Sequence, residues 1–391
     1  MFPFRIPFGG LLAVVAILAT AATPSVADEK WDAIPRRMQE FVDAGQISGA
    51  VTLVGHEGKV VHLEAVGQAD IENELPMAPD SIFAIASMTK PITATALLTL
   101  VDEGKVSLED PVARYIPEFG DAKLEGGPLK RPVTLRDLLT HTSGLVGSQQ
   151  NTGSLEETAR RLARRPLGFQ PGERWQYSPG ITVCGRVIEV ASGQPYDEFL
   201  ADRVFTPLAM VDTTFHPTPQ QQKRIVKLYK PGPEAGTLEA ASHWINELSE
   251  DRTPNPSGGL FSTAADMARF YQMVLAGGRG GGRRIVSPAA VKEMTSVQTG
   301  ELTTGFTPGN GWGWGWCVVR QPQGVSAMLS PGSFGHGGAF GTQGWVDPVR
   351  KTIFVLMIQR TDFGNSDASE IRTEFQRLAV EALKVLNTGQ Q

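Results

Sequence analysis

Cysteine is nearly absent from this chain of 391 residues, which contains only Cys184 and Cys317. The two lie far apart in apolar stretches, so we expect two buried thiols and no disulfide framework, with a single bridge left open. Neither has the electropositive neighbours of a nucleophilic thiol. With 41% hydrophobic residues, a chain of this length can bury a sizeable core without such cross-links.

Several ligand-binding patterns are also missing. The net charge is -5 without a strong basic block, which argues against nucleic acid as a partner. The glycine-rich run 277–282 is not followed by the Gly-Lys-Ser or Gly-Lys-Thr helix start of a phosphate loop. No His-Glu-x-x-His helix occurs, and the histidines lack ligand spacing, so we expect neither a metal nor a cofactor.

A long hydrophobic run is missing as well. The apolar run 11–18 is shorter than the roughly 20 residues of a spanning helix. It follows Arg5 and precedes small residues that end at Ala27, which is typical of a signal peptide over residues 1–27. We therefore expect an exported protein, periplasmic or secreted, with no stable membrane span after signal removal; an uncleaved anchor stays open.

The two ends of the remaining chain have similar patterns. A helix is predicted over 31–42, followed by a strand, the turn Glu57-Gly58 and a return strand. Near the other end, strands around 344–346 and 353–358 precede a helix over 369–385. The predicted class is α+β, with an antiparallel sheet flanked by N- and C-terminal helices and a mostly helical insertion.

We assign residues 28–391 to one domain. Its discontinuous α/β part covers about 28–90 and 310–391, and the helical insertion covers about 91–309. The segment 231–256, rich in Pro, Gly and Glu, is a candidate loop over the cleft. Three tryptophans alternate with glycines: Trp312, Trp314 and Trp316. On one strand their side chains would project to the same face, where they would either pack in the core or form the wall of an acyl pocket.

Ser87 and Lys90 lie one helical turn apart, at the start of a stretch with helical spacing that ends at Gly104. Pro91 fits the first turn, where backbone N–H groups have no intrahelical partner. Those N–H groups and the positive end of the helix dipole would favour an oxyanion there. A single Ser-x-x-Lys match often marks only a solvated helix face, but the apolar flanks argue against that interpretation.

Tyr177 is the best candidate base, because it precedes a predicted helix and could reach a cleft. An unperturbed phenol has a pKa near 10, so Tyr177 would need the Lys90 cation beside it to act as a phenolate. A packing role for this tyrosine stays open.

Five motifs then occur in an order typical of the serine β-lactamase and penicillin-binding-protein-like hydrolases: Ser87-Met88-Thr89-Lys90, the run 138–145, Tyr177-Ser178, the run 205–208 and Gly335-His336-Gly337-Gly338. The chain resembles this family over its whole mature length, and most of all the class C-like branch that includes family VIII carboxylesterases. The resemblance implies a β-lactamase/transpeptidase-like fold. It also implies that Ser87 is the acylated nucleophile, Lys90 the partner for its proton and Tyr177 the general base.

The third box of the family is matched by His336-Gly337-Gly338. This match implies that the N–H of Ala339 lies opposite the N–H of Ser87 as an oxyanion hole. Two positions depart from the β-lactamase pattern: Pro179 replaces an asparagine, and His336 replaces a lysine that would anchor a carboxylate. His141, in the run 138–145, is expected to organise a helix end and its loop.

These departures favour an exported carboxylesterase that acts through an acyl-enzyme on Ser87. A β-lactamase or D-alanyl-D-alanine peptidase is the alternative, and a non-catalytic wall-binding or scaffold protein of the same fold is the second. The expected partner is a small-molecule ester or a cell-wall-related substrate. Nothing in the sequence fixes the oligomeric state.

Overall fold

The structure is a computed structural model that describes residues 30–147, 153–249 and 252–388. The predicted signal peptide, residues 1–27, lies outside the described residues. Across the three described ranges, no helix combines the length and the apolar character needed to cross a membrane.

One antiparallel sheet organises the molecule, with the strand order β12-β13-β14-β15-β16-β1-β2-β3. Its strands are β1 (Gly49–His56), β2 (Lys59–Asp70), β3 (Leu75–Pro76), β12 (Asn310–Trp312), β13 (Cys317–Val319), β14 (Phe334–Gly337), β15 (Gln343–Asp347) and β16 (Thr352–Met357). The first strand pairs with the last in an antiparallel register, from Val51 opposite Met357 to His56 opposite Thr352. The prediction that both ends of the chain form one sheet is confirmed.

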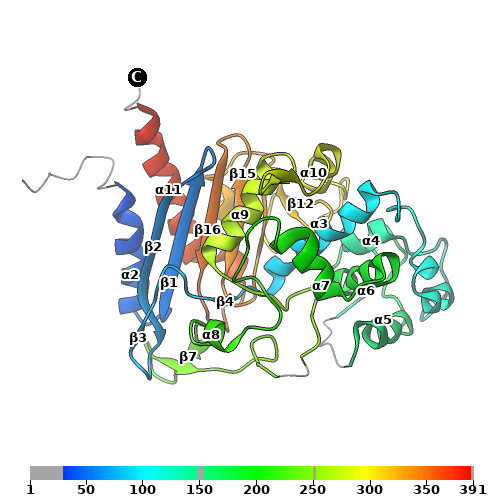
Figure 1. Ribbon diagram of the computed structural model, residues 1–391, viewed down its shortest axis with the longest axis horizontal. Helices are drawn as coiled ribbons and strands as arrows, with labels where there is room; N and C mark the ends of the chain where they lie inside the picture. The colour runs from blue at the N-terminus through cyan, green and yellow to red at the C-terminus, as the bar shows by residue number, and fades with distance from the viewer. Residues whose placement is uncertain (1–29, 148–152, 250–251, 389–391) are drawn as a thin grey trace, which may run out of the picture.

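Helices cover both faces of this sheet (Figure 1). The terminal helices α2 (Ala33–Asp43) and α11 (Glu370–Thr388) pack side by side on one face. Their apolar residues share a core cluster with the sheet, including Phe41, Phe354 and Phe375. Helix α9 (Ala264–Leu275) packs on the other face, against β1, β15 and β16. It therefore belongs with the sheet, although the sequence placed its residues inside the helical insertion.

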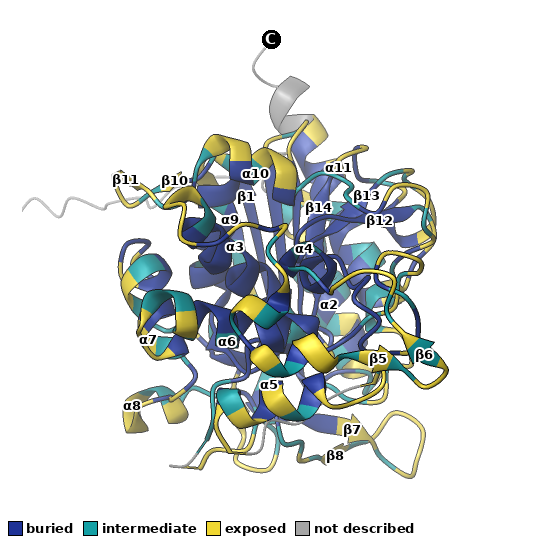
Figure 2. Cartoon of the chain, turned by 90° about the vertical axis from the view of Figure 1, so that its right-hand side faces the viewer, coloured by how far each residue is buried: buried dark blue, intermediate teal, exposed yellow. Residues whose placement is uncertain are grey.

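The remaining helices form a second layer beside the sheet: α3 (Thr89–Asp102), α4 (Leu135–Leu139), α5 (Leu155–Ala163), α6 (Gly180–Ser192), α7 (Tyr196–Leu200), α8 (Pro219–Gln222) and α10 (Pro288–Met294). Helix α3 is buried from Thr89 to Leu100 and packs against α6. Figure 2 shows α3 and α6 inside this layer, whereas α5 and α7 present exposed outer faces. Helix α3, which carries Lys90 and begins two residues after Ser87, thus lies at the hydrophobic centre of the molecule.

Short elements connect these layers. They comprise β4 (Phe83–Ala84), which pairs with β9 (Phe261–Ser262), and the hairpins β5 (Lys123–Leu124) with β6 (Gly127–Pro128), β7 (Tyr229–Pro231) with β8 (Leu238–Ala240), and β10 (Arg279–Gly280) with β11 (Arg283–Arg284). The short helical turns are η1 (Ala86–Met88), η2 (Val112–Arg114), η3 (Pro117–Asp121), η4 (Ala201–Phe205), η5 (Gly324–Ser326) and η6 (Ser366–Ala368).

The tryptophan repeat forms a hairpin instead of one strand. Trp312 ends β12 and faces Cys317 at the start of β13, and Gly315 in the turn has a φ of 77°. Glycine adopts this left-handed conformation without a Cβ penalty, which lets the chain reverse. Trp312 joins the core cluster of α2 and α11, whereas Trp314 and Trp316 join the cluster on the α3 side. The prediction that all three indoles share one face was wrong.

Candidate active site

Ser87 sits in the short turn η1, between β4 and α3. Its neighbour Ala86 has a φ of 44°, a region that costs a non-glycine residue about 1–3 kcal/mol. Residues that flank strands β15 and β16 hold this strained backbone: the Gln359 side-chain amide donates to the Ala84 carbonyl at 3.0 Å, and the Thr342 hydroxyl donates to the Ile85 carbonyl at 3.3 Å. Ala86 is buried while Ser87 remains half-exposed, so the turn presents the hydroxyl to the solvent side.

Lys90 is held against this hydroxyl. Its side-chain nitrogen lies 3.2 Å from the Ser87 oxygen and donates to the Ser257 carbonyl at 2.6 Å. The residue is only 3% exposed, and burial lowers the pKa of its amine to about 7. Near neutral pH a large fraction of Lys90 is therefore an uncharged amine, which has a lone pair for a proton.

Tyr177 lies on the other side of Lys90, whose nitrogen is 4.6 Å from the centre of the phenol ring. Burial raises the pKa of Tyr177, and a hydrogen bond with Ser87 opposes that shift only in part. Lys90 is not among the groups that lower it. Burial therefore favours the neutral phenol over the phenolate that the sequence considered for Tyr177.

The segment His336-Gly337-Gly338 runs along β14 towards Ser87. His336 is buried behind Tyr177 and does not line the pocket at Ser87. Burial and the nearby Lys90 lower the pKa of its imidazole to about 4. The ring is neutral, in line with the expectation that it is a poor anchor for a carboxylate.

Two backbone N–H groups lie at this junction without an acceptor. Within the described ranges, the N–H groups of Ser87 and Ala339 donate to no other protein group. Gly338 packs so closely on the chain before Ser87 that a Cβ on it would lie 2.6 Å from the Ile85 carbonyl oxygen. Only a glycine at position 338 allows the end of β14 to approach the turn that carries Ser87 in this way.

A pocket of about 300 Å³ opens beside Ser87. Trp244 and Ile245 contribute to its walls, so the loop predicted over the cleft does supply part of the lining. Among the described residues that line the pocket, Lys90 is the only charged one. The pocket therefore suits an uncharged, largely apolar group.

Sequence reasoning missed Ser257, whose carbonyl accepts from Lys90. Its segment is fixed from both sides, since Asn255 accepts from the Ser257 N–H at 2.9 Å and Thr93 donates to the Pro256 carbonyl at 2.7 Å. The only local signal was the turn-forming run Asn-Pro-Ser-Gly-Gly, which says nothing about its partner.

A cluster of aromatic rings packs against the ring of Tyr177. His141, Trp312 and Phe306 have ring centroids 4.6, 6.1 and 5.0 Å from that of Tyr177. His141 follows α4 with a φ of 59°, and its Nδ1 accepts from the Ser178 N–H at 3.2 Å. It organises the helix end and the tyrosine segment, as expected, and no contact joins it to Ser87.

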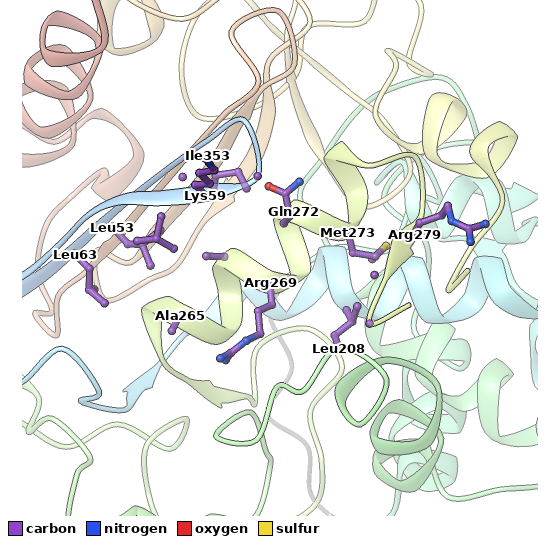
Figure 3. Close-up of a pocket in the computed structure, with 16 residues that line it drawn as sticks. Leu53, Lys59, Leu63, Leu208, Ala265, Arg269, Gln272, Met273, Arg279 and Ile353 are labelled. Carbon is purple, nitrogen blue, oxygen red and sulfur yellow. The ribbon is translucent and has the colours of Figure 1, made fainter. Parts of the chain in front are cut away.

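A second pocket lacks such reactive groups. A pocket of about 390 Å³ lies between the β1–β2 hairpin and α9, where Leu53, Leu63 and Met273 contribute apolar walls and Arg269 lies on the helix (Figure 3). No hydroxyl, thiol, imidazole or carboxylate side chain is among its lining residues. Cys184 and Cys317 are both free and buried, and no cluster of three or more potential metal ligands occurs in the described parts of the chain.

The eight-stranded antiparallel sheet, its helical layer and the serine–lysine turn between them define the β-lactamase/transpeptidase-like fold. The model of the Beta-lactamase family matches residues 34–379, and the chain belongs to this family.

Its relatives include an esterase, a penicillin-binding protein and a hydrolase. Esterase EstB of Burkholderia gladioli is 32% identical over 336 residues, which cover 77% of this chain and 83% of the relative. Penicillin-binding protein 4 of Amycolatopsis lactamdurans is 33% identical over 305 residues, which cover 76% of each. The solved structure of EstCE1, described as a hydrolase with promiscuous acyltransferase activity, superposes with a TM-score of 0.80 at 25% identity and covers 91% of this chain and 99% of its own.

Proposed function

We propose that this protein hydrolyses small carboxyl esters through an acyl-enzyme on Ser87. The observation that carries the proposal is the contact of 3.2 Å between the Ser87 hydroxyl and a buried lysine whose pKa is lowered to about 7. A serine hydroxyl is a weak nucleophile until a nearby base takes its proton, and an uncharged Lys90 supplies that base.

The reaction follows from this arrangement. The Lys90 amine accepts the Ser87 proton while the serine oxygen forms a bond to the ester carbonyl carbon. The oxyanion of the tetrahedral intermediate is stabilised by the N–H groups of Ser87 and Ala339. When the bond to the alkoxy oxygen breaks, the Lys90 ammonium returns the proton to the leaving alcohol. Water then attacks the acyl-enzyme in the same way and releases the acid.

The charges around the pocket favour an ester over a β-lactam. A penicillin carries a carboxylate that needs a cationic anchor, and Lys90 is the only charged residue among the described lining. His336 has a pKa near 4 and is neutral at pH 7. Pro179 offers no side-chain hydrogen bond where an amide is usual in β-lactamases. The esterase relatives EstB and EstCE1 agree with this preference.

Export through the segment 1–27 is part of the proposal, because this segment combines a positive start, a short apolar run and small residues. The test is expression of the full-length chain in a bacterial host, followed by fractionation and N-terminal sequencing. Export predicts a mature N-terminus near Asp28 outside the cytoplasm. An intact N-terminus in the cytoplasmic fraction would contradict it.

Ester hydrolysis is tested with p-nitrophenyl acetate and butyrate. We compare the wild type, Ser87→Ala and the matched surface control Ser107→Ala. The proposal predicts turnover by the wild type and the control, a loss of at least about 10³-fold in Ser87→Ala, and an acyl adduct on Ser87 by intact mass. Equal rates for Ser87→Ala and wild type would reject it.

A D-alanyl peptidase or β-lactamase is the second candidate, because Penicillin-binding protein 4 is among the relatives. The same preparations are incubated with a chromogenic cephalosporin and with a D-alanyl-D-alanine peptide. If either substrate is turned over faster than the esters, β-lactamase or peptidase activity becomes the preferred function and ester hydrolysis the second. Absence of any adduct with a fluorophosphonate would favour the non-catalytic alternative.

A further inference from the structure

We propose that His336 is a positioning residue that fixes the direction of the Tyr177 hydroxyl, so that the phenol hydrogen points away from Ser87 and the phenol oxygen faces it as an acceptor. This inference rests on the proposed function, because it concerns the same nucleophile. It goes further by assigning which way each hydrogen bond of the site runs.

The first step is the tautomer of His336. Its Nδ1 lies 2.6 Å from the carbonyl oxygen of Gly337. A carbonyl can only accept, so Nδ1 carries the hydrogen of this bond. Because the ring is neutral, its other nitrogen, Nε2, has no hydrogen and presents a lone pair.

The second step is the partner of that lone pair. The Nε2 atom lies 3.5 Å from the Tyr177 oxygen, at the outer limit of a hydrogen bond. Between these two atoms, only the phenol has a hydrogen to donate. Hydrogen bonds of a catalytic site are often long without substrate and shorten in its complex. The Tyr177 hydroxyl is therefore directed at His336.

The third step is the rigidity of the imidazole. His336 is 3% exposed, and Trp312 packs edge-on against it with ring centroids 5.5 Å apart. Its backbone pairs with Gly344 of β15, where a Cβ would lie 2.0 Å from the Tyr271 oxygen. The strand therefore cannot move towards α9, which keeps the backbone of His336 in place.

The charged groups that act on the ring are Lys90 and Asp367, which oppose each other. Lys90 disfavours an imidazolium, and Asp367 favours one. The Asp367 carboxylate accepts from the Gln343 amide at 3.0 Å, and no hydrogen bond joins it to the imidazole within the described chain. The neutral form with its hydrogen on Nδ1 is thus the resting state.

The result is a phenol whose hydrogen is directed at His336 and whose oxygen is left to face Ser87 as an acceptor. Lys90, whose nitrogen lies 3.2 Å from the Ser87 oxygen, is then the group that takes the serine proton when the hydroxyl attacks. In this arrangement the phenol has no hydrogen left for a leaving group, so the alcohol must take its proton from Lys90. A lysine at position 336 can only donate, which would turn the phenol hydrogen back towards Ser87.

The closing experiment reads the tautomer directly. Protein labelled with ¹⁵N-histidine is studied by two-dimensional NMR at pH 7, with His336→Gln to assign the resonances. We expect the pattern of a neutral ring protonated at Nδ1. A ring protonated at Nε2, or an imidazolium, would overturn the inference. The measurement needs no substrate, so its outcome is independent of whether the protein hydrolyses esters.

Kinetics of two variants then test the role in catalysis. His336→Gln keeps an acceptor for the phenol, and His336→Lys supplies only donors. We expect kcat to fall about tenfold more in His336→Lys than in His336→Gln, with similar KM values. The matched control is His62→Gln, a buried histidine that contacts Thr52 at 2.8 Å away from the site. Equal losses in both variants, each with unchanged thermal unfolding, would overturn the positioning role.

Discussion

Replacing Lys90 by methionine should remove catalysis and at the same time stabilise the protein. Methionine has a similar length but no charge, and position 90 is 3% exposed. The loss of a positioned base typically costs 10²–10⁴-fold in rate. The gain in stability arises because the folded state disfavours the ammonium form that the unfolded chain retains.

The size of this effect follows from the two pKa values. An ordinary lysine has a pKa of 10.5, and burial lowers that of Lys90 to about 7, a difference worth about 5 kcal/mol. The destabilisation of the folded state by Lys90 is complete below pH 7 and disappears as the pH rises towards 10.5. Between these two pH values Lys90 is protonated in the unfolded chain but not in the folded one. It amounts to about 5 kcal/mol at pH 6 and about 2 kcal/mol at pH 9. Leaving the Ser257 carbonyl without its donor costs about 1–3 kcal/mol at any pH.

The assay is urea unfolding of the wild type, Lys90→Met and the exposed control Lys223→Met at pH 6 and pH 9. We expect the advantage of Lys90→Met to shrink by about 3 kcal/mol between pH 6 and pH 9, and the control to show no such change. In parallel, kcat/KM of the wild type should rise with pH and level off near pH 7. An advantage that does not depend on pH, or an activity that rises only above pH 9, would refute the reasoning.

Three further predictions concern the walls of the site. Gly338→Ala should lower kcat about 10²-fold with little change in KM, because its Cβ would push β14 away from the Ile85 carbonyl and misplace the Ala339 N–H; steady-state kinetics check this. Trp244→Ala should enlarge the pocket and shift the preferred p-nitrophenyl ester to a longer acyl chain, which a series from acetate to decanoate will show. Burial raises the pKa of the Cys184 thiol, so the native protein should react with a thiol reagent only after denaturation; labelling at Cys184 in native buffer would contradict this.

Much of the fold was predictable because its signals are local. The hydrophobic pattern of the terminal segments predicted a helix and a hairpin at one end, and strands and a helix at the other. The helical spacing of the apolar residues after Ser87, with Pro91 in the first turn, placed Ser87 near a helix start, and both signals are local. Trp312 was misplaced, since alternation along a strand looks the same as two strands joined by a turn at Gly315.

The electrostatics of the site could not be predicted in the same way. The sequence suggested that a charged Lys90 would lower the pKa of Tyr177, but burial acts on both groups and drives each towards its neutral form. The Ser257 carbonyl reaches Lys90 from 167 residues away, through a contact that no local pattern encodes. The degree of burial is a property of the assembled layers and not of any one segment.

The pairing of β1 with β16 also constrains how the protein is made. The partner of Val51 is Met357, so the centre of the sheet cannot form until almost the whole chain has left the ribosome. Loop closure over such a separation is slow, and β1 keeps an open edge until it is complete. A chain that stops before Thr352 lacks the strand that joins its two halves. Synthesis therefore leaves the central sheet incomplete for most of the elongation of the chain.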